Sequence, residues 1–219
     1  MSEQHQEDRA KATVTYRDDK KRAPALREGG AAAFAPDEET HYTYADYCAW
    51  DDDQRWELID GIPYAMSAPT LTHEDIGRGL YLQFGNFLKG KSCKVYHAPV
   101  DVRLNADTAD NTVVQPDLLV VCDYAKFSDG KSCKGAPDLI IEIQSPSTAG
   151  YDRIIKLELY RKTGVREYWM VDPDTKTVQV CVLKDGQYYV TGYTGTDTAP
   201  VSVLLGLEIS LSDVFSEME

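Results

Sequence analysis

The sequence predicts an α/β protein in which a central mixed β-sheet is flanked by helices. Apolar residues recur at helical spacing over residues 72–88 and 151–164, and strand-like runs occupy most of the chain between and after these stretches. The second helical stretch separates two apolar strands, 136–145 and 165–172, so we expect these strands to lie side by side. The chain of 219 residues is long enough for one domain with its own core.

The N-terminal part differs in composition from the rest of the chain. Residues 1–36 are mostly polar and charged and end in GGAAAFAP, a run that buries little apolar surface. We therefore expect a mobile polar N-terminal tail over residues 1–36 and a single domain over residues 37–219.

Residues 43–68 predict a short helix followed by a hairpin. A helix is expected over 43–53, because Thr43 is a suitable N-cap and apolar residues follow at helical spacing. Two alternating runs, 55–61 and 62–68, then meet at Asp60-Gly61, and an Asp-Gly pair in this position is a strong hairpin signal.

The helix over residues 72–88 is expected to be amphipathic and to end before Gly90. Its expected buried side consists of Ile76, Leu80, Phe84, Phe87 and Leu88.

Strands are then expected over 93–104, with an interruption at Pro99, and over 113–123, followed by a loop over 124–135. After the strand over 136–145 comes the second helix, whose Gly164 suits a left-handed C-terminal position. Its expected core face consists of Ile154, Ile155, Leu157, Leu159 and Tyr160. The closing strands are 165–172, 176–186 and 187–195, and the terminal segment is 207–215.

Composition and charge exclude several classes of protein. The sequence has no apolar stretch long enough to span a bilayer and no secretory signal at its start, so we expect a cytoplasmic protein without a membrane partner. The net charge of -13 argues against a broad basic surface that coats nucleic acid, although a local basic groove is compatible with it. Five scattered cysteines with no zinc spacing predict reduced thiols.

One carboxylate interrupts an otherwise apolar strand. In PDLIIEIQS, residues 137–145, Glu142 alternates with the apolar side chains and shares a face with Gln144. Burying an unpaired carboxylate costs several kcal/mol, so a partner is required. The preceding strand supplies a second carboxylate, Asp117, which follows Pro116 in an equally apolar background.

Two carboxylates at one end of adjacent strands repel each other unless a cation lies between them. Hard oxygen ligands suit Mg²⁺ or Mn²⁺, and such an ion activates water and stabilises a leaving group in phosphodiester hydrolysis. Alternatively, Asp117 and Glu142 share a proton, or they pair with a buried cation such as Lys156 without catalysis.

The helix after the strand adds a positive charge. Asp152 and Lys156 are four residues apart and therefore share a helix face, where they can form an ordinary ion pair. In the functional interpretation, Lys156 reaches the carboxylates and supplies charge to the transition state, while Asp152 orients it.

These residues resemble two nested families. Asp117 followed by Glu142-Ile143-Gln144 resembles the PD-(D/E)XK nuclease superfamily. ELIDG at 57–61, His73, and PDLIIEIQSPSTAGYDRIIKLELYRKTGVREYWMVDP at 137–173 are similar to the Uma-type restriction-endonuclease family.

The resemblance covers about residues 45–215 and implies a restriction-endonuclease-like core, often dimeric. It implies that Asp117, Glu142 and the carbonyl of Ile143 ligate the metal. Gln144 stands where the superfamily has lysine, and Lys156 lies where a migrated lysine is expected.

Glu57 matches the glutamate of the family's ELIDG motif and is a candidate for a further acidic residue near the metal. His73 matches a family position too, and it is either a helix-capping or structural residue or a proton-transfer group.

We therefore expect a Mg²⁺- or Mn²⁺-dependent phosphodiesterase, an endonuclease acting on nucleic acid and in the first place on DNA, and a homodimer. In it Gln144 positions water and Lys156 supplies charge. The alternative is a catalytically inactive dimeric module of the same fold that binds nucleic acid or protein.

Overall fold

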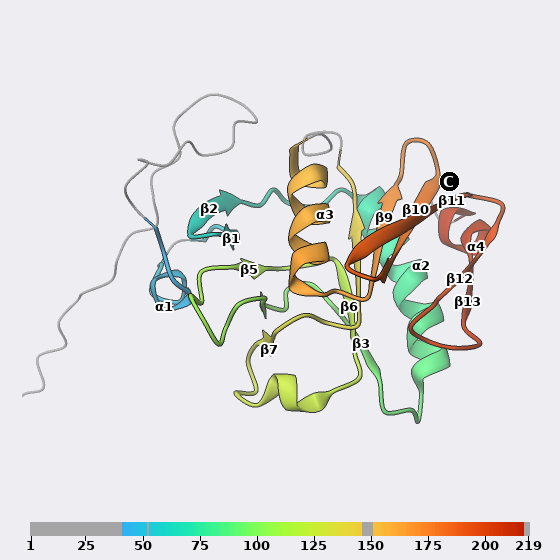
Figure 1. Ribbon diagram of the computed structural model, residues 1–219. Helices are drawn as coiled ribbons and strands as arrows, with labels where there is room; N and C mark the ends of the chain where they lie inside the picture. The colour runs from blue at the N-terminus through green and yellow to red at the C-terminus, as the bar shows by residue number, and fades with distance from the viewer. Residues whose placement is uncertain (1–40, 52, 146–150, 217–219) are drawn as a thin grey trace, which may run out of the picture.

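The computed structural model describes residues 41–51, 53–145 and 151–216, and it has the predicted mixed α/β architecture (Figure 1). The expected tail over 1–36 lies outside the described residues. The helices are α1 (Tyr44–Tyr47), α2 (Leu71–Leu88), α3 (Tyr151–Thr163) and α4 (Leu211–Ser216), with a 3₁₀ helix, η1 (Tyr124–Phe127). No helix in the described part of the chain is both long enough and apolar enough to cross a membrane.

A six-stranded sheet forms the centre of the protein, and its strand order is β11-β10-β9-β8-β6-β3. These strands are β3 (Lys94–His97), β6 (Leu118–Val121), β8 (Leu139–Ile143), β9 (Glu167–Asp172), β10 (Thr177–Lys184) and β11 (Gln187–Thr194). β8 and β9 pair in parallel and the other neighbours are antiparallel, so the sheet is mixed, as predicted.

Two smaller sheets complete the fold. The five-stranded sheet has the order β2-β1-β5-β4-β7, and β12 pairs with β13 near the C-terminus. The strands of the five-stranded sheet are β1 (Trp56–Ile59), β2 (Ile62–Ala65), β4 (Val102–Arg103), β5 (Val113–Val114) and β7 (Cys133–Lys134), and the C-terminal pair is β12 (Thr198–Pro200) and β13 (Glu208–Ser210).

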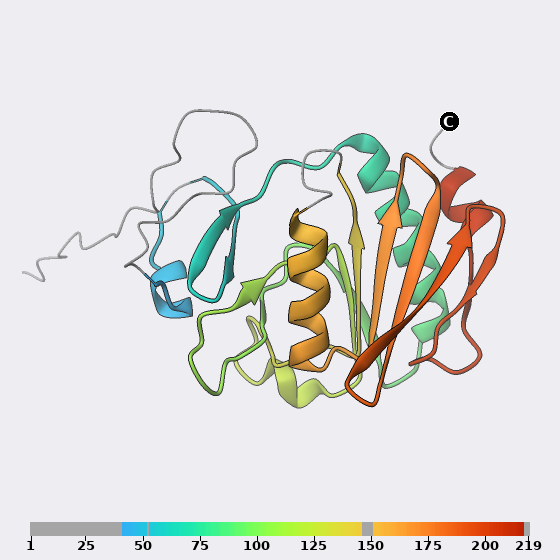
Figure 2. The ribbon, with the colours of Figure 1, turned by 45° about the horizontal axis from the view of Figure 1, so that its top comes forward.

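The helices α2 and α3 cover opposite faces of the six-stranded sheet (Figure 2). Strand alternation explains this arrangement, because successive side chains point to opposite faces. Ile141 and Ile143 of β8 pack on the α2 side, whereas Ile140 packs on the α3 side. Trp169, fully buried in β9, also packs on the α2 side.

The N-terminal hairpin is confirmed. β1 and β2 pair antiparallel through Asp60 and Gly61, both of which have positive φ. Positive φ at both central residues is the geometry of the turn that Asp-Gly favours. α1 is shorter than expected and ends at Tyr47, but Thr43 caps it in a capping box with Asp46.

The helix α2 begins after the N-cap Thr70 and buries Ile76, Leu80, Phe84 and Leu88, with Phe87 partly buried. In α3, the prediction that Ile154 belongs to the core is wrong, because this side chain is 72% exposed. Tyr160 is fully buried, and Gly164 ends the helix with φ of 87°.

The single strand predicted over 113–123 is divided between two sheets. β5 belongs to the five-stranded sheet and β6 to the six-stranded sheet, with Gln115, Pro116 and Asp117 between them. Proline has no N–H to donate to a strand ladder, so it favours a break at this point. The same division separates β3 from β4 at Pro99, where a break was expected.

The prediction of reduced thiols is wrong for one pair of cysteines. Cys93 and Cys122 form a disulfide with a Cα–Cα distance of 3.9 Å. Lys94 pairs with Val121 in the β3–β6 ladder, so the two cysteines lie opposite each other although 29 residues separate them in sequence. Among the described residues, Cys48, Cys133 and Cys181 remain thiols.

Candidate active site

Asp117 and Glu142 lie beside each other where β6 begins and β8 ends. In this antiparallel pair Leu118 is opposite Ile141, so Asp117 is opposite Glu142 one position further on. The carboxylate Oδ2 of Asp117 also accepts the backbone N–H of Ile143 at 2.7 Å. The strand register therefore brings together the two carboxylates that the sequence singled out.

Lys156 of α3 lies between two buried carboxylates. Its Nζ is 3.0 Å from Oε1 of Glu142 and 2.9 Å from Oε2 of Glu57. The side chains of Lys156, Glu57 and Glu142 are 13%, 7% and 14% exposed. A lysine 14 residues after Glu142 thus reaches the end of the strand, as the migrated-lysine interpretation requires.

Two residues that sequence reasoning assigned no functional role complete the cluster. The hydroxyl of Tyr160 donates a 2.7 Å hydrogen bond to Oε1 of Glu142. The backbone N–H of Gln115 donates to Oε1 of Glu57 at 2.9 Å. Tyr160 is four residues after Lys156 and therefore shares its helix face, which is the signal that the sequence offered.

The electrostatics of this cluster favour a further positive charge. Burial raises the pKa of Glu142 to about 7, although Lys156 opposes the rise. The negative charges of Asp117 and Glu57 add to it. Burial lowers the pKa of Lys156, but Glu142 and Glu57 outweigh this effect and raise it well above 10.5. Lys156 is therefore charged at neutral pH, and the three carboxyl groups of Asp117, Glu57 and Glu142 outnumber this one cation.

His73, in the first turn of α2, also contacts Asp117. Its Nε2 is 3.1 Å from Oδ2 of Asp117, and its backbone N–H is capped by Thr70. Burial disfavours the charged imidazole, but the hydrogen bond to Asp117 and the charge of that carboxylate outweigh it and raise the pKa of His73. His73 thus combines the capping position with a contact to the candidate site.

A pocket of about 250 Å³ opens beside Asp117, and we call it the α2 pocket. One wall is a stripe of α2, and the floor is formed by the strand ends. Its lining includes His73, Gly77, Arg78 and Tyr81 on the helix side and His97 and Asp117 on the strand side.

Gln144 and Asp152 are two further residues that the sequence singled out. Gln144 directly follows β8 and is half-buried, and its backbone N–H donates to the carbonyl of Val171 at 2.8 Å. The side chain of Asp152 lies outside the described residues, and so does the predicted pair with Lys156.

Among the described residues, no three His, Cys, Asp or Glu side chains are grouped closely enough to hold a metal by themselves. Mg²⁺ does not require such a group, because it commonly uses one or two carboxylates and completes its shell with water and substrate phosphate. The pair of Asp117 and Glu142, with excess acidic charge nearby, fits that donor set.

The fold resembles that of a crystal structure from Anabaena variabilis, described as "a putative nuclease belonging to DUF820". The TM-score is 0.67 at 20% sequence identity, over 81% of this chain and 99% of that chain. The six-stranded sheet and the two helices that cover it therefore form a restriction-endonuclease-like fold.

Sequence comparison identifies the family. Residues 43–212 match the Uma2 family, described as "Putative restriction endonuclease", and the chain belongs to this family. It is also 28% identical over 176 residues to the "Uncharacterized protein slr1290" of Synechocystis sp.. This alignment covers 78% of this chain and 89% of that protein.

Proposed function

We propose that the protein is a metal-dependent nuclease that hydrolyses phosphodiester bonds, with DNA as its substrate. One observation carries this proposal: Asp117 and Glu142 lie beside each other where β6 begins and β8 ends, and the Lys156 ammonium is 3.0 Å from Glu142. Membership of a family described as "Putative restriction endonuclease" supports the same reaction class.

In this proposal Asp117, Glu142 and the carbonyl of Ile143 hold Mg²⁺ or Mn²⁺. The bound ion supplies an activated water and stabilises negative charge on the phosphate. Gln144 follows Ile143 directly in the chain, and in this proposal its side-chain amide orients the water.

The roles of the remaining residues follow from their contacts. Lys156 offers its positive charge to the phosphate, and Glu57 holds that ammonium together with Glu142. Tyr160 keeps Glu142 in place through its hydroxyl. His73 orients Asp117 through the contact at Oδ2, the same oxygen that accepts the N–H of Ile143.

One observation favours the alternative of an inactive binding module. Lys156 already pairs with both Glu57 and Glu142, as the cation of a purely structural ion network does. The net charge of -13 also disfavours broad contact with nucleic acid.

Cleavage of supercoiled plasmid with Mg²⁺, Mn²⁺ or EDTA tests the proposal. We expect nicked and linear products only with a metal ion, and loss of cleavage in Glu142→Gln. The matched control is Glu158→Gln, because Glu158 lies on the neighbouring helix α3 but pairs with Arg161 and Lys162 at the surface. Equal cleavage by the wild type and Glu142→Gln would overturn the assignment.

The homodimer that the family resemblance implies is a separate proposal. Light scattering coupled to gel filtration measures it directly. A dimer corresponds to twice the chain mass of 24.5 kDa, and a mass of 24.5 kDa at working concentration would contradict it.

A further inference from the structure

The α2 pocket contains groups that the proposed hydrolysis does not use. Gly77 and Tyr81 follow His73 at intervals of four residues, so all three lie on one stripe of α2. Arg78 adds a guanidinium to the same wall, and His97 faces this wall from the end of β3. Asp117 belongs both to this pocket and to the carboxylate cluster, so the two sites are continuous.

The aromatic part of the wall suits a flat ring. Tyr81 is 36% exposed, and its ring meets that of His97 edge-on at a centroid distance of 5.2 Å. The Nδ1 of His97 contacts the carbonyl of Ala98 at 2.7 Å, and this contact fixes the orientation of the imidazole. A half-exposed tyrosine held against a fixed ring offers a stacking surface that accepts any nucleobase.

The charged part of the wall suits a phosphate. Arg78 pairs with Asp75 one helical turn away, at a long distance of 3.4 Å, and the two side chains are 53% and 38% exposed. A guanidinium presents its N–H donors as a planar fork that suits a phosphate, and this side chain lines the pocket. Glu74 is an acidic neighbour on this wall and opposes an anion.

The backbone of α2 leaves room for the ligand. A Cβ built at Gly77 meets only the Cδ1 of Ile143 within 4 Å, at 3.5 Å. A methyl group at this position is therefore accommodated, and a larger side chain occupies part of the pocket that Gly77 lines. The volume of about 250 Å³ is below the ~300–1,000 Å³ of sites for drug-sized ligands, which indicates a small ligand such as one nucleotide unit.

We propose that the α2 pocket binds the nucleotide next to the scissile phosphate, with its phosphate at Arg78 and its base against Tyr81. This inference rests on the proposed function, because it assigns the pocket to the same nucleic-acid strand. It adds a binding subsite and two residues, Arg78 and Tyr81, that determine substrate affinity rather than turnover.

Titration of the full-length protein with thymidine 5′-monophosphate in EDTA tests the pocket without metal or cleavage. Inorganic phosphate and thymidine serve as comparison ligands. We expect the nucleotide to bind about tenfold more tightly than either comparison ligand, since stacking and charge each contribute. Arg78→Ala and Tyr81→Ala should each weaken nucleotide binding about tenfold, and Glu74→Gln should strengthen it.

Two matched controls separate the pocket from general effects. Gly77→Leu should abolish nucleotide binding, whereas Gly85→Leu, on the same helix but outside the pocket, should preserve it. Arg161, like Arg78, pairs with an acidic residue three positions earlier, but it lies on α3, on the other face of the sheet. Arg161→Ala should therefore leave nucleotide binding unchanged.

The outcomes distinguish this inference from the proposed function. Saturable nucleotide binding that Gly77→Leu abolishes supports the pocket, even if no nucleic acid is cleaved. No saturable binding below about 10 mM nucleotide, or equal binding by Gly77→Leu and Gly85→Leu, overturns the pocket, even if the protein cleaves DNA. In an active enzyme, Arg78→Ala and Tyr81→Ala should raise KM with kcat unchanged, and a fall in kcat alone would contradict their binding role.

Discussion

Replacement of Lys156 by methionine removes the cation between two buried carboxylates. Methionine keeps the apolar length of the side chain, so the main change is the loss of charge near Glu57 and Glu142, which lie within 3.0 Å of the ammonium. Breaking a buried ion pair from one side costs about 3–5 kcal/mol, because an uncompensated charge remains. We expect Lys156→Met to lose about this much free energy of unfolding at pH 8 in EDTA.

The same variant should be less impaired in acid, and the sign follows from the pKa of Glu142. Burial raises this pKa from 4.5 to about 7 even with Lys156 present, and removing the cation raises it further. A carboxyl with a raised folded-state pKa stabilises the fold in its protonated form, and this contribution is lost as the pH rises through the folded-state pKa. In the wild type, the rise in the pKa of Glu142 from 4.5 to about 7 corresponds to about 3 kcal/mol of stability that is lost as the pH rises.

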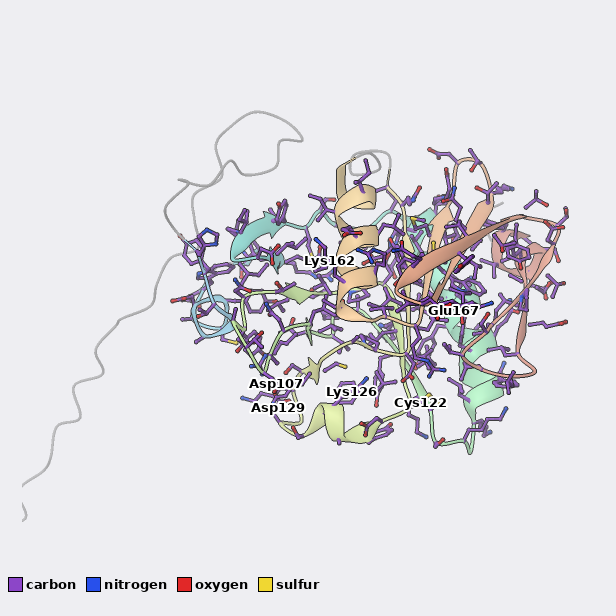
Figure 3. The ribbon with its side chains drawn as sticks, in the orientation of Figure 1. Asp107, Cys122, Lys126, Asp129, Lys162 and Glu167 are labelled. Atoms are coloured by element: carbon purple, nitrogen blue, oxygen red, sulfur yellow. A yellow bond between two sulfur atoms is a disulfide. The ribbon has the colours of Figure 1, made fainter. Side chains whose placement is uncertain are left out.

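Urea unfolding of Lys156→Met in EDTA at pH 5 and pH 8 measures both effects. The matched control is Lys162→Met, because Lys162 lies on the same helix (Figure 3) but is 67% exposed and pairs with a surface glutamate. We expect the control to change stability by less than about 1 kcal/mol at either pH. If Lys156→Met unfolds like the wild type at pH 8, the buried ion cluster is not present as described.

Three further predictions concern buried or locally bonded side chains, two of which Figure 3 labels. Tyr160→Phe keeps the ring packing but removes the hydrogen bond to Glu142, so urea unfolding should show a loss of about 1.5–3 kcal/mol; an unchanged midpoint would contradict the contact. Glu167 is fully buried and accepts from the indole of Trp169 and from a backbone N–H. Glu167→Ala leaves both donors unpaired and should cost about 3 kcal/mol, with a changed tryptophan emission as a second readout, and an unaltered spectrum would refute the indole contact. Hydrogen bonds from two backbone N–H groups and one hydroxyl hold the pKa of Asp129 well below its usual range, so its stabilising contribution is present above pH 4 and is lost as the pH falls. Asp129→Asn should therefore be less stable than the wild type at pH 7, with a gap that narrows below pH 4; a gap independent of pH would show that the charge is not stabilising.

The regular elements were predictable because local signals and packing agree in them. The positive φ at Asp60 and Gly61 and the cap at Thr43 follow from short motifs. The alternation in β8 correctly placed Ile141 and Ile143 on the face opposite Ile140. These features depend on neighbours within a few residues, which a single sequence contains.

The errors arose where distant segments decide the outcome. Ile154 is apolar, but it lies near the start of α3 and is exposed, so periodicity alone misplaces it. The disulfide of Cys93 and Cys122 depends on the β3–β6 register, and cysteine spacing carries no information about that register.

The candidate site was predictable only where a local pattern reports it. Apolar surroundings marked Asp117 and Glu142 as carboxylates that require a partner. The hydroxyl of Tyr160 was not singled out, because its aromatic ring matched the core pattern equally well. The link between Gln115 and Glu57 spans 58 residues, so no local pattern reports it.

Metal binding tests the central claim most directly. We would titrate Mn²⁺ and Mg²⁺ calorimetrically into the wild type, Asp117→Ala and Glu142→Ala, with the folding of each checked by circular dichroism. The account predicts specific binding near one ion per chain in the wild type and none in either folded variant. Absence of binding to the wild type at about millimolar ion, or undiminished binding in both variants, would contradict it and leave Glu142 as a structural partner of Lys156.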